Sequence, residues 1–130
     1  MLFKNKFLML ILLVSFQSNA SDLSEFCDSI EGSIIISADN DKKYLGKITS
    51  SYDSESIFNE YGNYGGKYST NSIWNSYSKY GSEYNSYSPF NEYSLNPPMV
   101  IKNNRIIAKL TVNDSISNAL NPYVLKAYKF

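Results

Sequence analysis

The sequence predicts a mainly β fold: two hairpins forming a small sheet, with turn-rich aromatic repeats between them and short helical segments at the C-terminal end. Two observations carry this prediction. β-Branched runs separated by turn residues lie on both sides of the middle of the chain, which is typical of hairpins. Between these runs the chain repeats itself every sixteen residues, and each copy is rich in Tyr, Asn and Ser.

The first hairpin is expected over residues 33–50. Three isoleucines at 34–36 form a short β-branched run, residues 38–41 have turn chemistry, and residues 44–49 form a second strand candidate. Because short polar side chains dominate the turn, we expect a loop whose side chains are solvated.

The repeat occupies residues 52–96, with complete copies at 52–67 and 68–83 and a truncated copy at 84–96. So many matches at one spacing do not arise by chance, and we expect equivalent residues to have equivalent surroundings. The matching sets are Tyr52, Tyr68 and Tyr84; Ser56, Ser72 and Ser88; Ile57 and Ile73; Phe58, Trp74 and Phe90; Asn59, Asn75 and Asn91; Tyr61, Tyr77 and Tyr93; Tyr64 and Tyr80; and Gly65 and Gly81.

Each copy is expected to be a tight turn followed by a short extended piece. Nine of the twelve tyrosines lie in residues 52–93, whereas Ile57 and Ile73 are the only aliphatic side chains there, so any core is aromatic. Asn and Gly are turn formers, because Asn bonds its own backbone and Gly tolerates positive φ. The residues expected to hold turns are Asn59, Asn75, Asn91, Asn121, Gly65 and Gly81.

The rings of the repeat allow three interpretations. They pack inside a small turn-rich domain, or they form a surface ladder for a glycan, peptidoglycan or protein partner, or the tract is disordered or self-assembling. If the ladder is correct, Trp74, Tyr61 and Tyr77 are the residues expected to stack on the ligand.

The second hairpin is expected over residues 97–113. Residues 99–101 lead to Asn103-Asn104, a good pair for a tight turn, and residues 106–112 return.

The two ends of the chain also match each other. Residues 44–49 match residues 106–111 at an offset of 62, and residues 119–123 repeat the step at 57–61. We interpret the chain as a duplicated hairpin-plus-repeat unit with the middle copies inserted.

The C-terminal segment, residues 114–130, is expected to contain two short helical pieces. Residues 123–128 form one candidate, and Asp114 or Ser115 is a candidate cap for a short turn of helix before it.

The N-terminal residues 1–20 have the pattern of a secretory signal peptide. Lys4 and Lys6 precede an apolar run from Phe7 to Phe16, and small residues end at Ala20, where we expect cleavage. The run is well short of the roughly 20 residues that span a bilayer as a helix, so no transmembrane segment is expected after cleavage. The remaining residues, 21–130, are expected to form a single exported domain, periplasmic or secreted.

Cys27 is the only cysteine, so the chain cannot form an internal disulfide. A lone exported cysteine is either a small buried residue or a thiol that pairs with another chain. We expect burial beside Phe26 and Ile30.

Composition excludes several function classes. The chain contains no His, which removes Ser-His-Asp and Cys-His catalysis and most zinc sites. Asp39 and Asp41 lack the Gly and the distant Glu of an EF-hand loop, so neither a metal nor a cofactor is predicted. A glycosidase needs only two carboxylates, and Glu60 and Glu92 occupy equivalent repeat positions, but solvated turn residues are the favoured interpretation. The acidic repeat also disfavours nucleic acid.

One stretch of the chain is similar to a known group of sequences. The residues that carry the likeness are Tyr44-Leu45-Gly46, Asp53-Ser54, Ser56-Ile57, Asn59, Tyr61-Gly62, Tyr64-Gly65, Lys67-Tyr68-Ser69, Ser72-Ile73 and Asn75. Over about residues 44–123 this pattern resembles small exported bacterial proteins with tandem S-x-x-N-x-Y-G-x-Y-G-S-x-Y-S units. The resemblance implies no activity, ligand or functional residue. Many members carry Asn-Pro-Tyr, but here only Pro122 matches, which leaves the other turns less rigid.

Together these features predict an exported, non-enzymatic binding or structural protein of the bacterial envelope, with a glycan or an envelope protein as partner. Two alternatives stay open: a carboxylate-dependent glycan-active enzyme, and a self-assembling surface protein.

Overall fold

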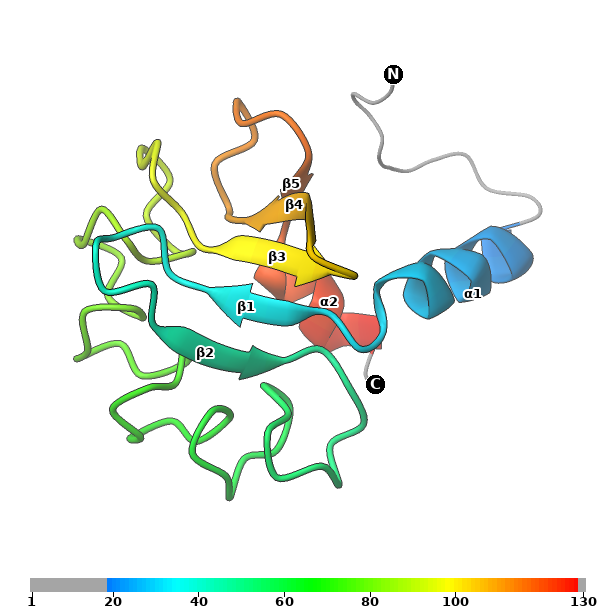
Figure 1. Ribbon diagram of the computed structural model, residues 1–130, viewed down its shortest axis with the longest axis horizontal. Coiled ribbons are helices and arrows are strands. Elements are labelled where there is room, and N and C mark those ends of the chain that lie inside the picture. Colours follow the sequence, from blue (N-terminus) through cyan, green and yellow to red (C-terminus); the bar gives the residue numbers. More distant parts are fainter. Residues whose placement is uncertain (1–18, 129–130) are drawn as a thin grey trace.

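A five-stranded mixed sheet forms the centre of the protein, and the described residues also contain two short helices (Figure 1). The computed structural model describes residues 19–128, so the predicted signal peptide lies outside it except for its last two residues. In chain order the elements are α1 (Asn19–Ile30), β1 (Ile34–Ile36), β2 (Tyr44–Lys47), β3 (Met99–Lys102), β4 (Arg105–Leu110), β5 (Ala119–Leu120) and α2 (Pro122–Tyr128). The fold is mainly β, as the sequence predicts.

The sheet has the strand order β2-β1-β3-β4-β5. β1 pairs antiparallel with both β2 and β3, β3 pairs antiparallel with β4, and β4 pairs parallel with β5. The turn between β3 and β4 is formed by Asn103 and Asn104, whose φ angles are 54° and 64°. Two successive positive φ angles match the right-handed twist of the flanking strands, and asparagine tolerates them better than most residues.

The β1–β2 pair and the β3–β4 pair are joined by the pairing of β1 with β3. Both β2 and β4 also have a parallel neighbour. Lys47 of β2 lies opposite Ser56, and Lys109 of β4 lies opposite Ala119. In both places the backbone N–H of the lysine donates to the carbonyl of the residue that precedes its partner, at 2.9 and 3.0 Å. Both hairpins therefore receive the following segment in the same way.

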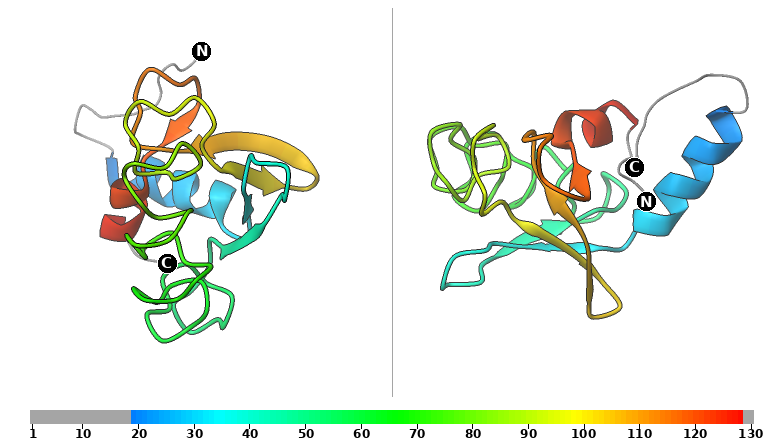
Figure 2. Two further views of the ribbon diagram at one scale, coloured as in Figure 1. Left: turned by 90° about the vertical axis from the view of Figure 1, so that its left-hand side faces the viewer. Right: turned by 90° about the horizontal axis from the view of Figure 1, so that it is seen from above.

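Residues 50–94, here called the turn layer, lie together with α2 on one side of the sheet (Figure 2). The layer runs as successive loops from the β2 end of the sheet toward the β3–β4 end (Figures 1 and 2). Between the sheet and this layer lies one apolar core, which is the main source of stability. Its fully buried members are Ile35, Leu45, Ile48, Ile57, Ile73, Val100, Leu110 and Leu125.

Gly46 lets the turn layer approach β2 closely. The pairing of β1 with β2 is irregular here, and Gly46 has a φ of 114°. A Cβ at this position would lie 2.8 Å from side-chain carbons of both Ile57 and Tyr64. A glycine is therefore required for the backbone angle and for the contact.

α1 was not expected from the sequence, and it projects away from the sheet (Figure 1). Only Ile30 at its last turn enters the core, while Cys27 is half-buried and Phe26 is 38% exposed. The prediction that Cys27 is buried beside Phe26 is therefore wrong, because this part of the helix has little to pack against. The helix end is held by Lys102, whose ammonium donates to the Ser29 carbonyl at 2.9 Å.

Residues 114–128, the described part of the C-terminal segment, contain one helix instead of two. Asn121 caps α2, since its Oδ1 accepts the Tyr123 N–H at 2.8 Å, and Pro122 takes the first helical position. The short helix expected to begin at Asp114 or Ser115 is instead one non-helical backbone turn. Asn113 caps this turn, because its Oδ1 accepts the Ser115 N–H. No helix in residues 19–128 has the length and apolar character needed to cross a membrane.

Candidate functional site

The turn layer is a continuous series of backbone turns. At nearly every third residue from Asp53 to Ser94, an N–H donates to the carbonyl three residues earlier, at 3.0 to 3.5 Å. Four such three-residue steps and one four-residue step make sixteen residues. We call residues 50–65, 66–81 and 82–94 the first, second and third turn units. The extended piece that the sequence suggested is absent from these units, apart from the single bridge at Ser56.

Side chains at the same positions cap these turns. The oxygen of a Ser, Asn or Asp accepts the N–H two residues later, which is the Asx or Ser/Thr turn that competes with helix and sheet. The Asn59, Asn75 and Asn91 side chains each accept a tyrosine N–H in this way, at 2.9 to 3.0 Å. The other capping residues of the layer are Ser50, Asp53, Ser56, Ser72, Ser82, Asn85, Ser88 and Ser94.

Gly65 and Gly81 lie in the four-residue steps that close the first and second turn units. A Cβ on Gly65 would overlap the carbonyl of Asn59, and a Cβ on Gly81 would overlap the carbonyl of Asn75. Glycine is required at both positions because the backbone there passes directly over the backbone of the same turn unit.

The inner face of the layer packs on the sheet. Ile57, Ile73 and Pro89 lie sixteen residues apart and are fully buried. The units are also tied to each other, because the indole N–H of Trp74 donates to the Ile57 carbonyl at 2.6 Å. These three positions are therefore buried alike, whereas Tyr64 lies against Tyr44 and its repeat equivalent Tyr80 bonds Asp39.

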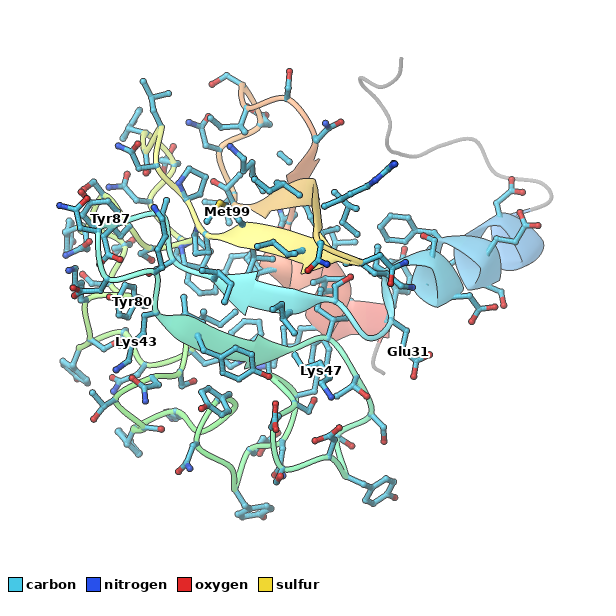
Figure 3. All side chains as sticks on the ribbon, viewed as in Figure 1. Glu31, Lys43, Lys47, Tyr80, Tyr87 and Met99 are labelled. Carbon is cyan, nitrogen blue, oxygen red and sulfur yellow. The ribbon has the colours of Figure 1, made fainter. Side chains whose placement is uncertain are left out.

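The outer face presents two rows of tyrosines. Six side chains, two from each turn unit, are between 76 and 99% exposed, and their hydroxyls make no hydrogen bond within residues 19–128. Figure 3 shows aromatic rings pointing outward from the loops of the layer. The rows, here called the tyrosine rows, are Tyr52, Tyr68 and Tyr84, and Tyr61, Tyr77 and Tyr93.

The second turn unit is fastened to the β1–β2 turn through Asp39. This carboxylate is 5% exposed; it pairs with the Lys79 ammonium at 2.7 Å and accepts the hydroxyls of Ser37 and Tyr80 at 2.6 and 2.7 Å. The labelled Tyr80 lies beside the β1–β2 turn in Figure 3. The expectation of a solvated loop is therefore wrong at this residue, because the turn layer covers it.

The same contacts control the ionisation of Asp39. Burial alone would raise its pKa, but the hydrogen bonds from Lys79 and the two hydroxyls, with the positive charge of Lys79, hold the pKa well below its usual range. The carboxylate is therefore charged wherever the protein is folded at moderate pH, and it acts as a fixed structural anion.

A hollow of about 760 Å³ opens where the first and second turn units meet, beside α2. Its walls include three aromatic rings, from Tyr61, Tyr68 and Trp74, and the charged side chains of Lys67 and Lys126. Concave sites with rings and a few polar groups are the usual form of small-ligand sites.

The structure separates the three residues expected to stack on a ligand. Trp74 and Tyr61 line the hollow, whereas Tyr77 does not, although it belongs to the same row as Tyr61. Sequence reasoning did not assign Lys67, Tyr68 or Lys126 to a ligand site, although all three line the hollow. The sixteen-residue spacing already pointed to Tyr68, but Lys126 reaches the hollow from α2, and no sequence signal indicated it.

The ring of Trp74 is partly covered by neighbouring side chains. Phe90 lies against it with ring centroids 5.5 Å apart, and the Lys126 ammonium lies 4.5 Å from its centroid. Tyr123 of α2 extends the cluster, 5.1 Å from Phe90. Trp74 therefore joins the second and third turn units to α2, and it supports the lysine at the edge of the hollow.

Glu60 and Glu92, the two carboxylates considered for a glycan-active enzyme, do not both line the hollow. Glu60 lines it, but its repeat equivalent Glu92 does not, and both are exposed. Residues 19–128 contain no cluster of three or more His, Cys, Asp or Glu side chains placed to hold a metal ion.

Comparisons with models of known families, with curated proteins and with solved structures gave no significant match.

Proposed function

We propose that this is an exported binding protein of the bacterial envelope, and that it holds an extended glycan such as peptidoglycan on its tyrosine rows. In this proposal the sixteen-residue unit is the building block, and two hairpins form the sheet that supports successive units. The export step rests on the signal-like residues 1–20, with cleavage after Ala20.

The observation that carries the proposal is the exposure of the two rows. Large apolar groups that repeat on one surface are characteristic of binding sites. Tyrosine suits such a surface because its ring is apolar while its hydroxyl can bond a polar ligand. Since the row hydroxyls have no partner within residues 19–128, all six are free for a ligand.

The backbone under the rows supports the same conclusion. In five of the six row residues, the N–H is bonded to the capping side chain two residues earlier. The exception is Tyr68, because the residue two positions before it is Gly66, which has no side chain to accept the N–H. A ligand that meets side chains on a fixed backbone does not have to order that backbone, which lowers the entropic cost of binding.

Regular spacing favours a ligand that is itself regular. A polymer of sugar rings offers one apolar face and many hydroxyls per unit, so it can meet several tyrosines of a row at once. Several weak contacts on one chain raise the overall affinity well above that of one contact.

The experiment is a pelleting assay with purified peptidoglycan sacculi and with chitin as a second insoluble glycan. The mature domain should pellet, and replacing Tyr61, Tyr77 and Tyr93 together by Ser should lower its affinity at least about tenfold. Tyr128→Ser, an exposed tyrosine of α2 outside the rows, is the matched control and should bind as the wild type does.

Two results would overturn the proposal. If neither glycan pellets the wild type, the rows have another partner. If the triple variant binds like the control, the rows do not make the contact. Sedimentation of the free protein covers the self-assembly alternative, because rows that join copies would give larger species that the triple variant abolishes.

A further inference from the structure

The hollow between the first and second turn units differs in charge from the layer around it. The turn layer is acidic overall, since Asp and Glu outnumber Lys in it. The hollow instead has two lysines, Lys67 and Lys126, and a single carboxylate, Glu60. The local field therefore favours a negatively charged group, although the chain as a whole does not.

These two lysines also differ from the other lysines near the layer. The Lys79 ammonium lies 2.7 Å from Asp39, and that of Lys47 lies 3.8 Å from Asp53. No carboxylate of residues 19–128 pairs with either lysine of the hollow.

Aromatic rings hold the two lysines in place. The Lys126 ammonium lies 4.5 Å from the centroid of Trp74, and the Lys67 ammonium lies 5.6 Å from that of Tyr68. A cation over a ring face is attracted by the ring's negative face, and it keeps its N–H donors free for another acceptor. Both ammonium groups are thus positioned at the hollow with donors to spare.

We propose that this hollow binds an acidic saccharide unit, a sugar ring that carries a carboxylate. The sugar ring packs against Tyr61 and Tyr68, and the carboxylate lies between Lys67 and Lys126. This rests on the proposed function, because it names the ligand class that the hollow adds to the tyrosine rows.

A carboxylate fits the site better than a neutral sugar does. Hydrogen bonds between charged partners are about twice as strong as neutral ones. A neutral sugar could use the rings, but it would leave both ammonium groups without an anion. A longer polyanion such as a nucleic acid would meet the acidic remainder of the layer.

The test compares ligands that differ only in the acidic group. N-Acetylmuramic acid differs from N-acetylglucosamine by a lactyl carboxylate, and oligogalacturonate can be compared with its methyl ester. Trp74 is the only tryptophan, so its fluorescence reports on the hollow alone, and calorimetry gives the affinities. The first pair tests a peptidoglycan source of the carboxylate, and the second tests a uronic acid source.

We expect the full mature domain to bind at least one acidic ligand about tenfold more tightly than its neutral counterpart. Lys126→Gln and Lys67→Gln should each remove most of that preference while changing the neutral ligand less than about twofold. Lys43→Gln, an exposed lysine on the β1–β2 hairpin, removes the same charge elsewhere and should keep the preference. Unchanged thermal unfolding of the two variants would show that they are folded.

The outcomes separate this inference from the proposed function. If both members of each pair bind equally well, the acidic preference is wrong while glycan binding stands. If the preference survives both lysine variants, the carboxylate binds elsewhere. If the wild type binds neither these ligands nor sacculi, both proposals fall.

Discussion

The sheet and the turn layer satisfy their backbone groups in different ways. At the centre of the sheet the paired strands β1 and β3 are far apart in the chain, as in the pairing of Ile35 with Val100. In the turn layer about every third N–H donates to a carbonyl three or four residues earlier, and capping side chains accept many of the N–H groups between. The sheet therefore depends on long-range pairing, and the turn layer depends on residue identity at every third position.

The difference also shows what each region cannot do alone. The turn layer supplies little to the core beyond Ile57, Ile73, Pro89, Tyr80 and a few half-buried rings, so it cannot bury enough apolar surface to order itself. The sheet has short strands and one open face, and it needs the layer as a cover. The two regions should therefore unfold together, with substitutions at their contacts having the largest effects.

The largest effect is expected where the layer crosses β2. Gly46→Ala adds a Cβ 2.8 Å from carbons of Ile57 and Tyr64 and places a side chain at a φ of 114°, so we expect a loss of about 3–4 kcal/mol. Gly32→Ala is the matched control, because Gly32 also has a positive φ of 89° but has nothing within 4 Å of the added Cβ. It should cost about 1 kcal/mol. Denaturant unfolding measures both, and equal costs would contradict the close contact.

The next effect concerns the buried anion that joins the two regions. Asp39→Asn removes the charge that accepts from Lys79 and two hydroxyls, and it should cost about 2–3 kcal/mol at neutral pH. The pKa of Asp39 is lowered by folding, so its stabilising effect is present above the unfolded value of about 4 and is lost as the pH falls below it.

Two measurements check this prediction. The stability difference between the wild type and Asp39→Asn should shrink between about pH 4 and pH 2. Asp41→Asn, in the same turn but exposed, should change stability by less than about 0.5 kcal/mol at any of these pH values. A difference that stays constant with pH would show that the carboxylate is not an ion pair partner.

A smaller effect is expected from the caps. Asn75 is 8% exposed; it accepts the Tyr77 N–H and donates to the Ser69 carbonyl at 2.9 Å, so Asn75→Ala should cost about 2 kcal/mol. Asn91 makes one such bond, to Tyr93, and Asn91→Ala should cost about 1 kcal/mol or less. Hydrogen exchange should become faster at Tyr77 in the first variant while the sheet amides stay protected. Equal losses would contradict a role for burial at the cap.

The smallest effect distinguishes inner from outer tyrosines. Tyr80→Phe removes the hydroxyl that donates to Asp39 and should cost about 1 kcal/mol. Tyr84→Phe removes a hydroxyl that is exposed and unpaired within residues 19–128, and it should leave stability unchanged. Thermal unfolding of the two variants gives the comparison, and a loss in Tyr84→Phe would show that the outer row is structural.

Local patterns in the sequence pointed to many of the elements. The isoleucines of β1 and the Asn103-Asn104 turn were visible as strand and turn signals. The sixteen-residue spacing matched Ile73 to Ile57 and Trp74 to Phe58. The three-residue phase of the turns was also present, as a Ser, Asn or Asp at almost every third position, but the sixteen-residue spacing hid it. α1 was missed because its apolar stripe is short, although Gly32 is a usual helix stop.

The sequence by itself determined the local geometry, because a cap, a tight turn or a β-branched run depends on residues within a few positions of one another. Only the tertiary structure decided which rings are buried, that Asp39 is an internal anion, and that Lys126 of α2 lines the hollow between the first two turn units. Tyr80 and Tyr84 are the same residue type in the same tract, yet one is covered by the sheet and the other is open. Burial and charge pairing depend on which distant segments meet, and that is determined by how the whole chain buries its apolar surface.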